Sequence, residues 1–188
     1  MDTRGQRTEQ AIATCFLSLL EKKSISQITV TEICQLACIN RATFYKHYLD
    51  VYHLQDSLEA EILRDLEAFL RDHAFSGLGN YETMMIDLLS YAKRYGHTFY
   101  ILCSSNAVSD LPARVFQLLY SLAFPILKEK LPNLSEEQAK LLYQYISNGS
   151  GSVLRGWLAG ESSMEERELA KFIMLTSGAT VAAVAERG

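Results

Sequence analysis

The chain has 188 residues, of which 48% are hydrophobic, 10% aromatic and 21% charged. That length suits one domain, or a small domain fused to a larger one, and it suffices for a core without disulfide or metal staples. The formal net charge of −4 at pH 7 excludes a globally basic nucleic-acid-binding protein, although a locally basic surface stays open. Residues 1–55 hold six Lys/Arg and five Asp/Glu, so they carry a net charge of +1 and the remainder carries −5. The asymmetry is small, and its sign is the one expected of a nucleic-acid-binding head on an acidic body.

Several classes of protein fit the composition poorly. No run approaches 18 consecutive apolar residues, and no apolar stretch follows a basic start, so we expect neither a membrane partner nor a secretory signal. The cysteines lie in apolar or small-residue contexts, which predicts reduced, buried thiols in a cytoplasmic protein. No His or Cys follows at metal-finger spacing, so we expect no metal site and no cofactor. The four cysteines are Cys15, Cys34, Cys38 and Cys103.

The spacing of apolar residues predicts an all-α fold. Only three prolines occur, apolar residues recur mostly at intervals of three and four, and no convincing alternating strand is present. The clearest break in the chain is the segment 76–80. About nine helices are predicted, over residues 7–21, 29–37, 41–48, 51–75, 81–95, 97–104, 110–131, 135–159 and 164–186.

The first three predicted helices have the outline of a helix-turn-helix. Thr29 and Glu32 have the spacing of a capping box, which predicts the start of the second helix. Asn40 is a good N-cap for the third helix, and a three-residue turn separates the two. Two short helices joined in this way are typical of DNA-binding modules.

The third helix has a polar outer face that suits DNA. Phe44 and Tyr48 share one face and can pack inward, which leaves the polar side chains outward. An arginine fits the edge of guanine, a threonine can contact bases, and Tyr, Lys and His suit phosphate oxygens. An ordinary amphipathic helix with a solvated polar face is the alternative. The outward residues are Arg41, Thr43, Tyr45, Lys46 and His47.

Residues 28–33 and 39–48 together resemble the DNA-binding head of TetR-family transcriptional regulators, and the resemblance covers about residues 7–55. It implies a helix-turn-helix DNA-binding domain over residues 1–50 and a helical ligand-sensing and dimerisation domain over residues 51–188. It also implies base reading at Arg41, recognition-helix contacts at Thr43, Tyr45 and His47, and a phosphate contact at Thr31. The candidate DNA-binding residues are Thr31, Asn40, Arg41, Ala42, Thr43, Tyr45, Lys46 and His47.

The sequence departs from the family pattern at three positions. Cys38 and Ala42 stand where glycines are usual, and Cys38 would be strained if the turn demands a left-handed backbone. Val51 replaces a common lysine, which removes an expected phosphate contact and makes Lys46 a candidate to replace it. Residues 44–50 and 149–160 resemble a subgroup common in Gram-positive bacteria. For Arg4 and Arg7, contact with DNA and a solvated tail are both open.

Residues 81–131 are rich in aromatic and soft side chains. Such a set could line a pocket for a small apolar ligand, although aromatic residues at helical spacing more often form a solid core. The resemblance favours the pocket, because many family members sense small molecules. The candidate pocket residues are Met85, Tyr91, Tyr95, Phe99, Cys103, Phe116, Tyr120 and Phe124.

The last two predicted helices carry stripes of apolar and small residues. These stripes suit a homodimer interface in which small residues let helices approach closely. Packing of the same stripes within one subunit is the alternative. The candidate dimer residues are Tyr145, Gly149, Val153, Trp157, Phe172, Thr176 and Ala179.

These observations predict a cytoplasmic, homodimeric repressor that binds a palindromic operator in double-stranded DNA and that a small-molecule ligand releases. The alternative is a coactivator or protein-interaction module of the same fold that works through a protein partner. We expect no catalytic residue. Gly149–Gly151 lacks the surroundings of a phosphate-binding loop, and the spacing of the four histidines suggests neither a triad nor a metal site.

Overall fold

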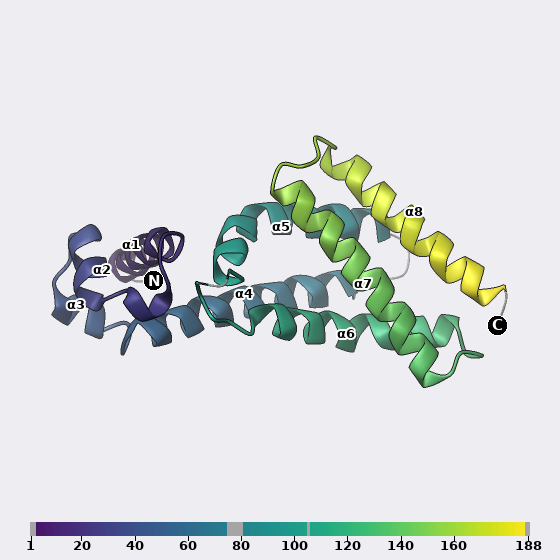
Figure 1. Cartoon of the computed structure of the whole chain (residues 1–188), viewed down its shortest axis with the longest axis horizontal. Coiled ribbons are helices and arrows are strands. Elements are labelled where there is room, and N and C mark those ends of the chain that lie inside the picture. The colour runs from purple at the N-terminus through teal and green to yellow at the C-terminus, as the bar shows by residue number, and fades with distance from the viewer. Residues whose placement is uncertain (1–2, 75–80, 105, 187–188) are drawn as a thin grey trace. The chain divides into compact units, whose positions relative to one another are not determined.

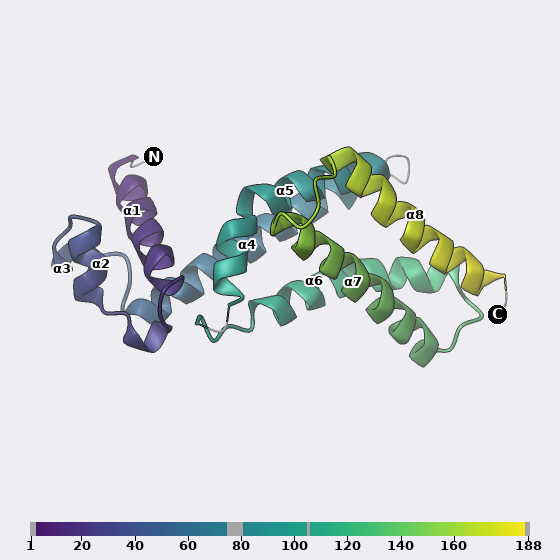
Figure 2. The same cartoon turned by 45° about the horizontal axis from the view of Figure 1, so that its top comes forward.

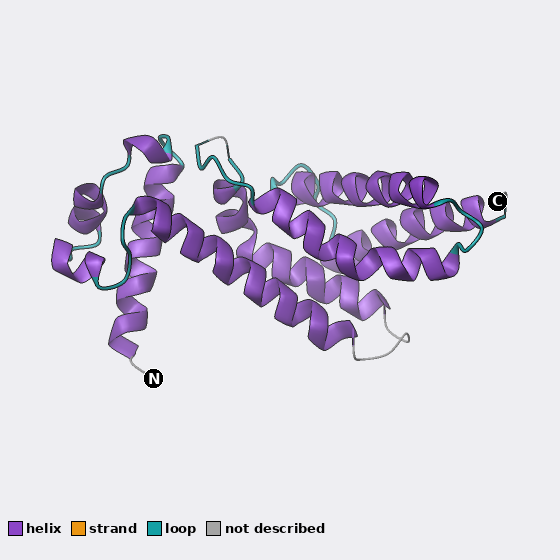
Figure 3. Ribbon diagram, turned by 90° about the horizontal axis from the view of Figure 1, so that it is seen from below, coloured by secondary structure: helices purple, strands orange, loops and turns teal. Residues whose placement is uncertain are grey.

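The computed structural model describes residues 3–74, 81–104 and 106–186, and within them it contains helices and no strand (Figure 3). The predicted all-α fold is therefore confirmed. Eight α-helices and one short 3₁₀ helix follow each other along the described chain (Figure 1). They are α1 (Thr3–Leu20), η1 (Ile25–Gln27), α2 (Val30–Leu36), α3 (Arg41–Tyr45), α4 (Val51–Ala74), α5 (Tyr81–Leu102), α6 (Leu111–Lys130), α7 (Glu136–Leu158) and α8 (Glu166–Ala185).

The predicted count of about nine helices is close to the observed one, and the difference lies at Gly96. The two helices expected over residues 81–95 and 97–104 form the single helix α5. Gly96 is buried, and a Cβ atom added to it would lie 3.1 Å from Cδ2 of Leu158. The glycine therefore allows α5 and the end of α7 to approach closely and does not end a helix. The predicted break at residues 76–80 lies outside the described residues.

Side-chain caps fix several helix starts where the sequence predicts them. The Thr29 hydroxyl accepts from the Glu32 amide, and the Glu32 carboxylate accepts from the Thr29 amide at 3.0 Å. Ser135 forms the same reciprocal pair with Gln138 at the start of α7. These caps satisfy amides that have no partner inside a helix, which sets the first residue of α2 and α7.

The chain divides into two compact units, residues 1–68 with 97–114 and residues 69–96 with 115–188. In the first unit α1 packs on α2, and α2 packs on α3. The segment between α5 and α6 is fastened to the end of α1, because the Asn106 side-chain amide donates to the Leu20 carbonyl at 3.0 Å. The fully buried side chains of this unit include Ile12, Phe16, Leu20, Ile33, Phe44 and Leu54.

The second unit has its own apolar core, built by α5, α7 and α8. Figures 1 and 2 both show α7 and α8 lying side by side. The loop between them is closed by the Trp157 indole, which donates to the Met164 carbonyl at 2.8 Å. The buried centre of this core is Leu89, Leu169, Ala170 and Ile173, with Met85, Ile86, Leu154 and Trp157 packed against it.

All four cysteines are free thiols, but only one of them is buried. Cys34 is buried, whereas Cys15 and Cys103 are partly buried. The prediction of a buried thiol is wrong for Cys38, which is exposed because it lies in the tight turn after α2 has ended. Across the described ranges, no group of three or more His, Cys, Asp or Glu side chains is arranged to hold a metal ion.

Candidate nucleic-acid interface

The helix α3 is one short, strongly capped turn. The Asn40 side-chain oxygen accepts from the Thr43 amide at 2.7 Å and from the Thr43 hydroxyl at 3.0 Å. The predicted N-cap at Asn40 is therefore confirmed. The helix ends at Tyr45, three residues before the predicted end, because the amides of His47 and Tyr48 both turn back to the Phe44 carbonyl.

Phe44 anchors this helix in the core of the first unit. Its side chain is 0% exposed, and its ring centroid lies 5.8 Å from that of Tyr48, as the shared inner face predicts. Tyr48 is partly buried, and burial, with Glu9 and Glu61 nearby, raises the pKa of its phenol to about 12. The Tyr48 phenol therefore stays neutral at physiological pH. The burial of Phe44 determines which face of α3 is turned to solvent.

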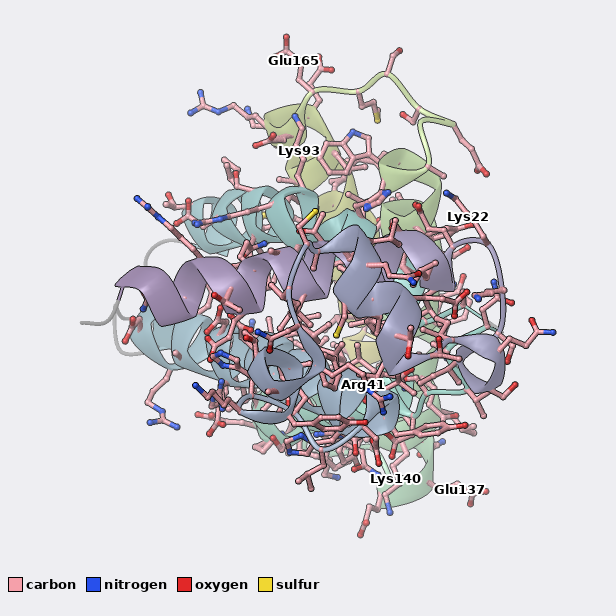
Figure 4. All side chains as sticks on the ribbon, turned by 90° about the vertical axis from the view of Figure 1, so that its left-hand side faces the viewer. Lys22, Arg41, Lys93, Glu137, Lys140 and Glu165 are labelled. Atoms are coloured by element: carbon pink, nitrogen blue, oxygen red, sulfur yellow. The ribbon has the colours of Figure 1, made fainter. Side chains whose placement is uncertain are left out.

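Two exposed residues on the outer face of α3 interact with each other. Nη2 of Arg41 donates to the Tyr45 hydroxyl at 3.2 Å, and the guanidinium carbon lies 5.8 Å from the centre of the Tyr45 ring. The hydrogen bond with Tyr45 raises the pKa of the Arg41 guanidinium, which keeps its full charge. Figure 4 labels Arg41, whose guanidinium forms the outer end of the side chain. With the exposed Lys46, this face presents two fixed cations and a phenol.

Two other predicted contacts are occupied within the protein. The Thr43 hydroxyl is bonded to Asn40, and Thr43 is only partly exposed. Nδ1 of His47 lies 3.0 Å from Oε1 of Glu9 in α1, and the His47 side chain is 19% exposed. Glu9 was not predicted as a site residue, because it precedes His47 by 38 residues and no local pattern links the two. Thr31 and Ala42 are exposed on α2 and α3.

The turn between α2 and α3 demands the left-handed backbone expected at a glycine position. Cys38 has a φ of 53°, and the next amide, of Ile39, donates to the Cys34 carbonyl at 3.0 Å. A cysteine therefore carries the strain that glycine would avoid, of about 1–2 kcal/mol.

At the other end of α2, the Lys23 ammonium lies 2.6 Å from Glu32 Oε1. This contact and the hydrogen bonds from Thr29 lower the pKa of the Glu32 carboxyl to about 2.

The start of α4 replaces the usual lysine with a buried valine. Val51 is buried, while the next residue, Tyr52, exposes its phenol. Asp50 caps the start of the helix by accepting from the His53 amide at 2.8 Å, and His53 Nδ1 accepts from the preceding Leu49 amide at 3.3 Å.

The N-terminal arm is helical in its described part. Helix α1 begins at Thr3, four residues before the predicted start, so Arg7 lies within a helix. The side chain of Arg4 lies outside the described residues.

The candidate pocket residues are all partly buried, and ring contacts join several of them. In the second unit Tyr91 stacks with Tyr95 at a centroid distance of 4.7 Å. The Tyr120 ring lies 4.6 Å from that of Phe124 and 5.0 Å from that of Tyr143, which is buried and was not among the predicted pocket residues. Phe99 and Cys103 belong to the first unit, and the other six belong to the second.

Six of the seven candidate dimer residues are exposed. Trp157 is the exception, because it packs on the core of its own unit and bonds to Met164. Large apolar side chains beside the others are also exposed, including Leu175, at 71%. Of the described helices, only α8 is long and apolar enough to cross a membrane by length and composition alone, which is weak evidence for a span. The exposed candidates are Tyr145, Gly149, Val153, Phe172, Thr176 and Ala179.

Comparisons with known proteins agree with this architecture. A family model described as the C-terminal region of transcriptional regulators of the TetR type matches residues 79–177. A TetR transcriptional regulator from Streptococcus agalactiae is similar, with a TM-score of 0.65, 24% identity, and coverage of 94% of this chain and 96% of that one. The fatty acid degradation regulator FadR from Bacillus halodurans has a TM-score of 0.61, 14% identity and 96% coverage of both chains. The dihydroxyacetone kinase operon activator DhaS has a TM-score of 0.58, 19% identity, and coverage of 94% and 97%. No curated protein sequence matches significantly.

Proposed function

Since the chain belongs to the TetR family of transcriptional regulators, we propose that it is a homodimeric repressor that binds a palindromic operator and that a small apolar ligand releases. Regulators of this family bind DNA, act as dimers and are not enzymes. The observation that carries the proposal is the capped helix α3, which turns Arg41, Tyr45 and Lys46 to solvent from a buried anchor at Phe44.

The DNA-binding domain in this proposal is residues 1–50, with the outer face of α3 in the major groove. Arg41 reads a base, because its planar guanidinium can donate two hydrogen bonds to guanine. Lys46 and Thr31 contact phosphates and set the register of the helix on the duplex. Asn40 and Ala42 lie at the helix start nearest the bases. Thr43 and His47 also contact the DNA in this proposal, either in place of their present partners Asn40 and Glu9 or in addition to them.

The exposed stripes of α7 and α8 form the proposed dimer interface. Large apolar residues on a helix face are stabilised when a second copy removes them from water. Gly149 supports close approach, because nothing lies within 4 Å of the place where its Cβ would be. A twofold axis then relates two recognition helices, about 34 Å apart, which requires a palindromic operator. Trp157 contributes by holding the loop between the two helices.

The remaining domain, residues 51–188, is proposed to sense the ligand. Within the second unit, the partly buried aromatic residues of α5 and α6 supply an apolar lining with phenol groups for orientation. A ligand that prefers a different spacing of the two heads lowers operator affinity by linkage. An aromatic core without a ligand remains the alternative for these residues. Because a repressor must reach its operator, we propose that the protein acts in the cytoplasm.

Selection of bound sequences from a random DNA pool tests the proposal. The wild type should enrich a palindromic consensus, and Arg41→Ala should relax base preference at one symmetric position by about 1–3 kcal/mol. Circular dichroism and sedimentation first establish that both proteins are folded dimers. A folded dimeric wild type that enriches no sequence would remove the DNA-binding proposal.

A coactivator that works through a protein partner is the second candidate. Two observations favour it: the fold is similar to that of a protein named as an operon activator, and Val51 is buried where a phosphate-binding lysine is usual. The same selection distinguishes the two candidates. A folded dimer that binds a protein partner and shows no specific DNA affinity is the result that the coactivator predicts.

A further inference from the structure

We infer that Tyr45 is a positioning residue, which holds Arg41 in the orientation that reads the operator base. The inference rests on the proposed DNA-binding function and deepens it. It differs from a direct phosphate contact by Tyr45, because it assigns the contribution of the phenol to the arginine beside it.

The geometry of α3 brings the two side chains together. Arg41 is the first residue of the helix and Tyr45 the last, so they are one turn apart on the same face. The hydroxyl accepts from Nη2 at 3.2 Å, and the ring lies under the guanidinium at 5.8 Å. Two different interactions, a hydrogen bond and a cation–π contact, therefore restrain the same guanidinium.

The tyrosine ring is itself held by the core. Its edge meets the ring of Phe44 at a centroid distance of 5.6 Å and an interplanar angle of 89°. Because Phe44 is fully buried, this contact restrains one side of the Tyr45 ring, while 48% of the tyrosine stays exposed. The Asn40 cap fixes the other end of the helix, at the residue preceding Arg41. Arg41 thus extends from a capped backbone and lies against a ring that the core restrains on one side.

This arrangement leaves the arginine free to read a base. A guanidinium has five N–H donors, and the hydrogen bond to Tyr45 uses only one of them. The remaining donors still include one on each terminal nitrogen, which suffices for a bidentate contact with guanine. A long arginine side chain otherwise loses much rotamer freedom on binding, so prior restraint by Tyr45 favours the complex.

A double-mutant cycle tests the inference. The four proteins are wild type, Arg41→Ala, Tyr45→Phe and the double variant, with Tyr52→Phe as the control for another exposed phenol of the same unit. Tyr45→Phe keeps the ring and its contact with Phe44 and removes only the hydroxyl. Affinity is measured by fluorescence anisotropy on the selected operator and on operators substituted at the base pair that Arg41→Ala identifies.

We expect Tyr45→Phe to weaken operator binding about 3- to 10-fold and to reduce discrimination at the Arg41 base pair. In the Arg41→Ala background the same change should cost less than about 2-fold. Tyr52→Phe should leave discrimination at that base pair unchanged in both backgrounds.

Three outcomes would overturn the inference. An equal loss from Tyr45→Phe in both backgrounds would show that the hydroxyl contacts DNA directly. Tighter binding by Tyr45→Phe would show that the tyrosine holds the arginine away from the base. A folded dimeric wild type that binds no specific DNA would overturn the proposed function along with this inference, whereas the first two outcomes leave the proposed function intact.

Discussion

The α1–α3 segment and the α7–α8 pair differ in how much of their large apolar side chains they bury. In the first segment Ile12, Phe16 and Phe44 are 0% exposed, so this part of the core is complete within one chain. On α7 and α8 large apolar side chains stay in solvent, and Tyr145 and Leu175 are each 71% exposed. The difference fits a recognition segment whose core is complete within one chain and the proposal that the α7–α8 surface pairs with a second copy.

The two regions also differ in what defines their helices. The recognition segment uses short helices whose ends are fixed by side-chain caps, at Thr29 for α2 and at Asn40 for α3. Helices α7 and α8 also begin at capping boxes, but they have 23 and 20 residues, so packing along one face contributes more to their stability than the caps do. Changes of the same chemistry should therefore have unequal effects in the two regions.

The largest expected contrast comes from shortening one phenylalanine in each region. Phe44→Ala leaves a cavity in a complete core and should lower the free energy of unfolding by about 3–5 kcal/mol. Phe172→Ala, at a 45% exposed position, should change the stability of the isolated chain by much less. Urea denaturation at low protein concentration measures both. Equal losses would mean that the α7–α8 surface is already buried within one chain.

A charge on the exposed stripe should separate subunits without unfolding them. Leu175→Asp places a carboxylate in the proposed interface of both subunits, and we expect dimer dissociation to become easier by about 3 kcal/mol or more. Leu122→Asp on α6, at a position 41% exposed, is the matched control and should leave the dimer intact. Analytical ultracentrifugation measures the dissociation constants. A stable Leu175→Asp dimer would place the interface on another face.

The first unit contains a buried charge whose partner is partly exposed. Glu59 accepts from the Gln55 amide at 2.9 Å and lies 3.3 Å from Nη1 of Arg114. Arg114→Ala should cost about 1–3 kcal/mol of folding free energy, less than a fully buried pair would, because the Arg114 side chain is 40% exposed. Adding Glu59→Leu should recover most of that loss, as thermal denaturation would show. No recovery would indicate that Arg114 contributes by packing alone.

The smallest effect concerns the Glu32 carboxylate and depends on pH. Its pKa is lowered from 4.5 to about 2 in the folded chain, by the contacts with Lys23 and Thr29. A lowered folded pKa means that the stabilisation is fully present above pH 4.5 and is lost as pH falls through about 2. The stability difference between wild type and Glu32→Gln should therefore shrink over this window, and added salt should reduce it at pH 7. Glutamine keeps the capping geometry, so the variant removes only the charge, and a stability difference that does not change with pH would exclude the charge as its cause.

The sequence by itself determined the local features of this protein. The caps at Thr29, Asn40 and Ser135 and the inward position of Phe44 follow from interactions within a few residues of each other. The left-handed backbone at Cys38 was expected only if the turn demanded it, from the resemblance to a family that usually has glycine there. Residue type and spacing determine such interactions, so one amino-acid sequence is enough to predict them. The all-α fold follows from the same periodicity.

Only the tertiary structure decided the features that join distant segments. The pairing of His47 with Glu9, the burial of Glu59 and the role of Trp157 within its own unit depend on contacts between separate helices. Gly96 is another case that the sequence could not decide. A glycine at this position predicted a helix end, whereas in the structure it allows close packing against Leu158. These outcomes depend on which faces meet in space, and helical periodicity shows only that a residue lies on a face, without identifying what that face meets.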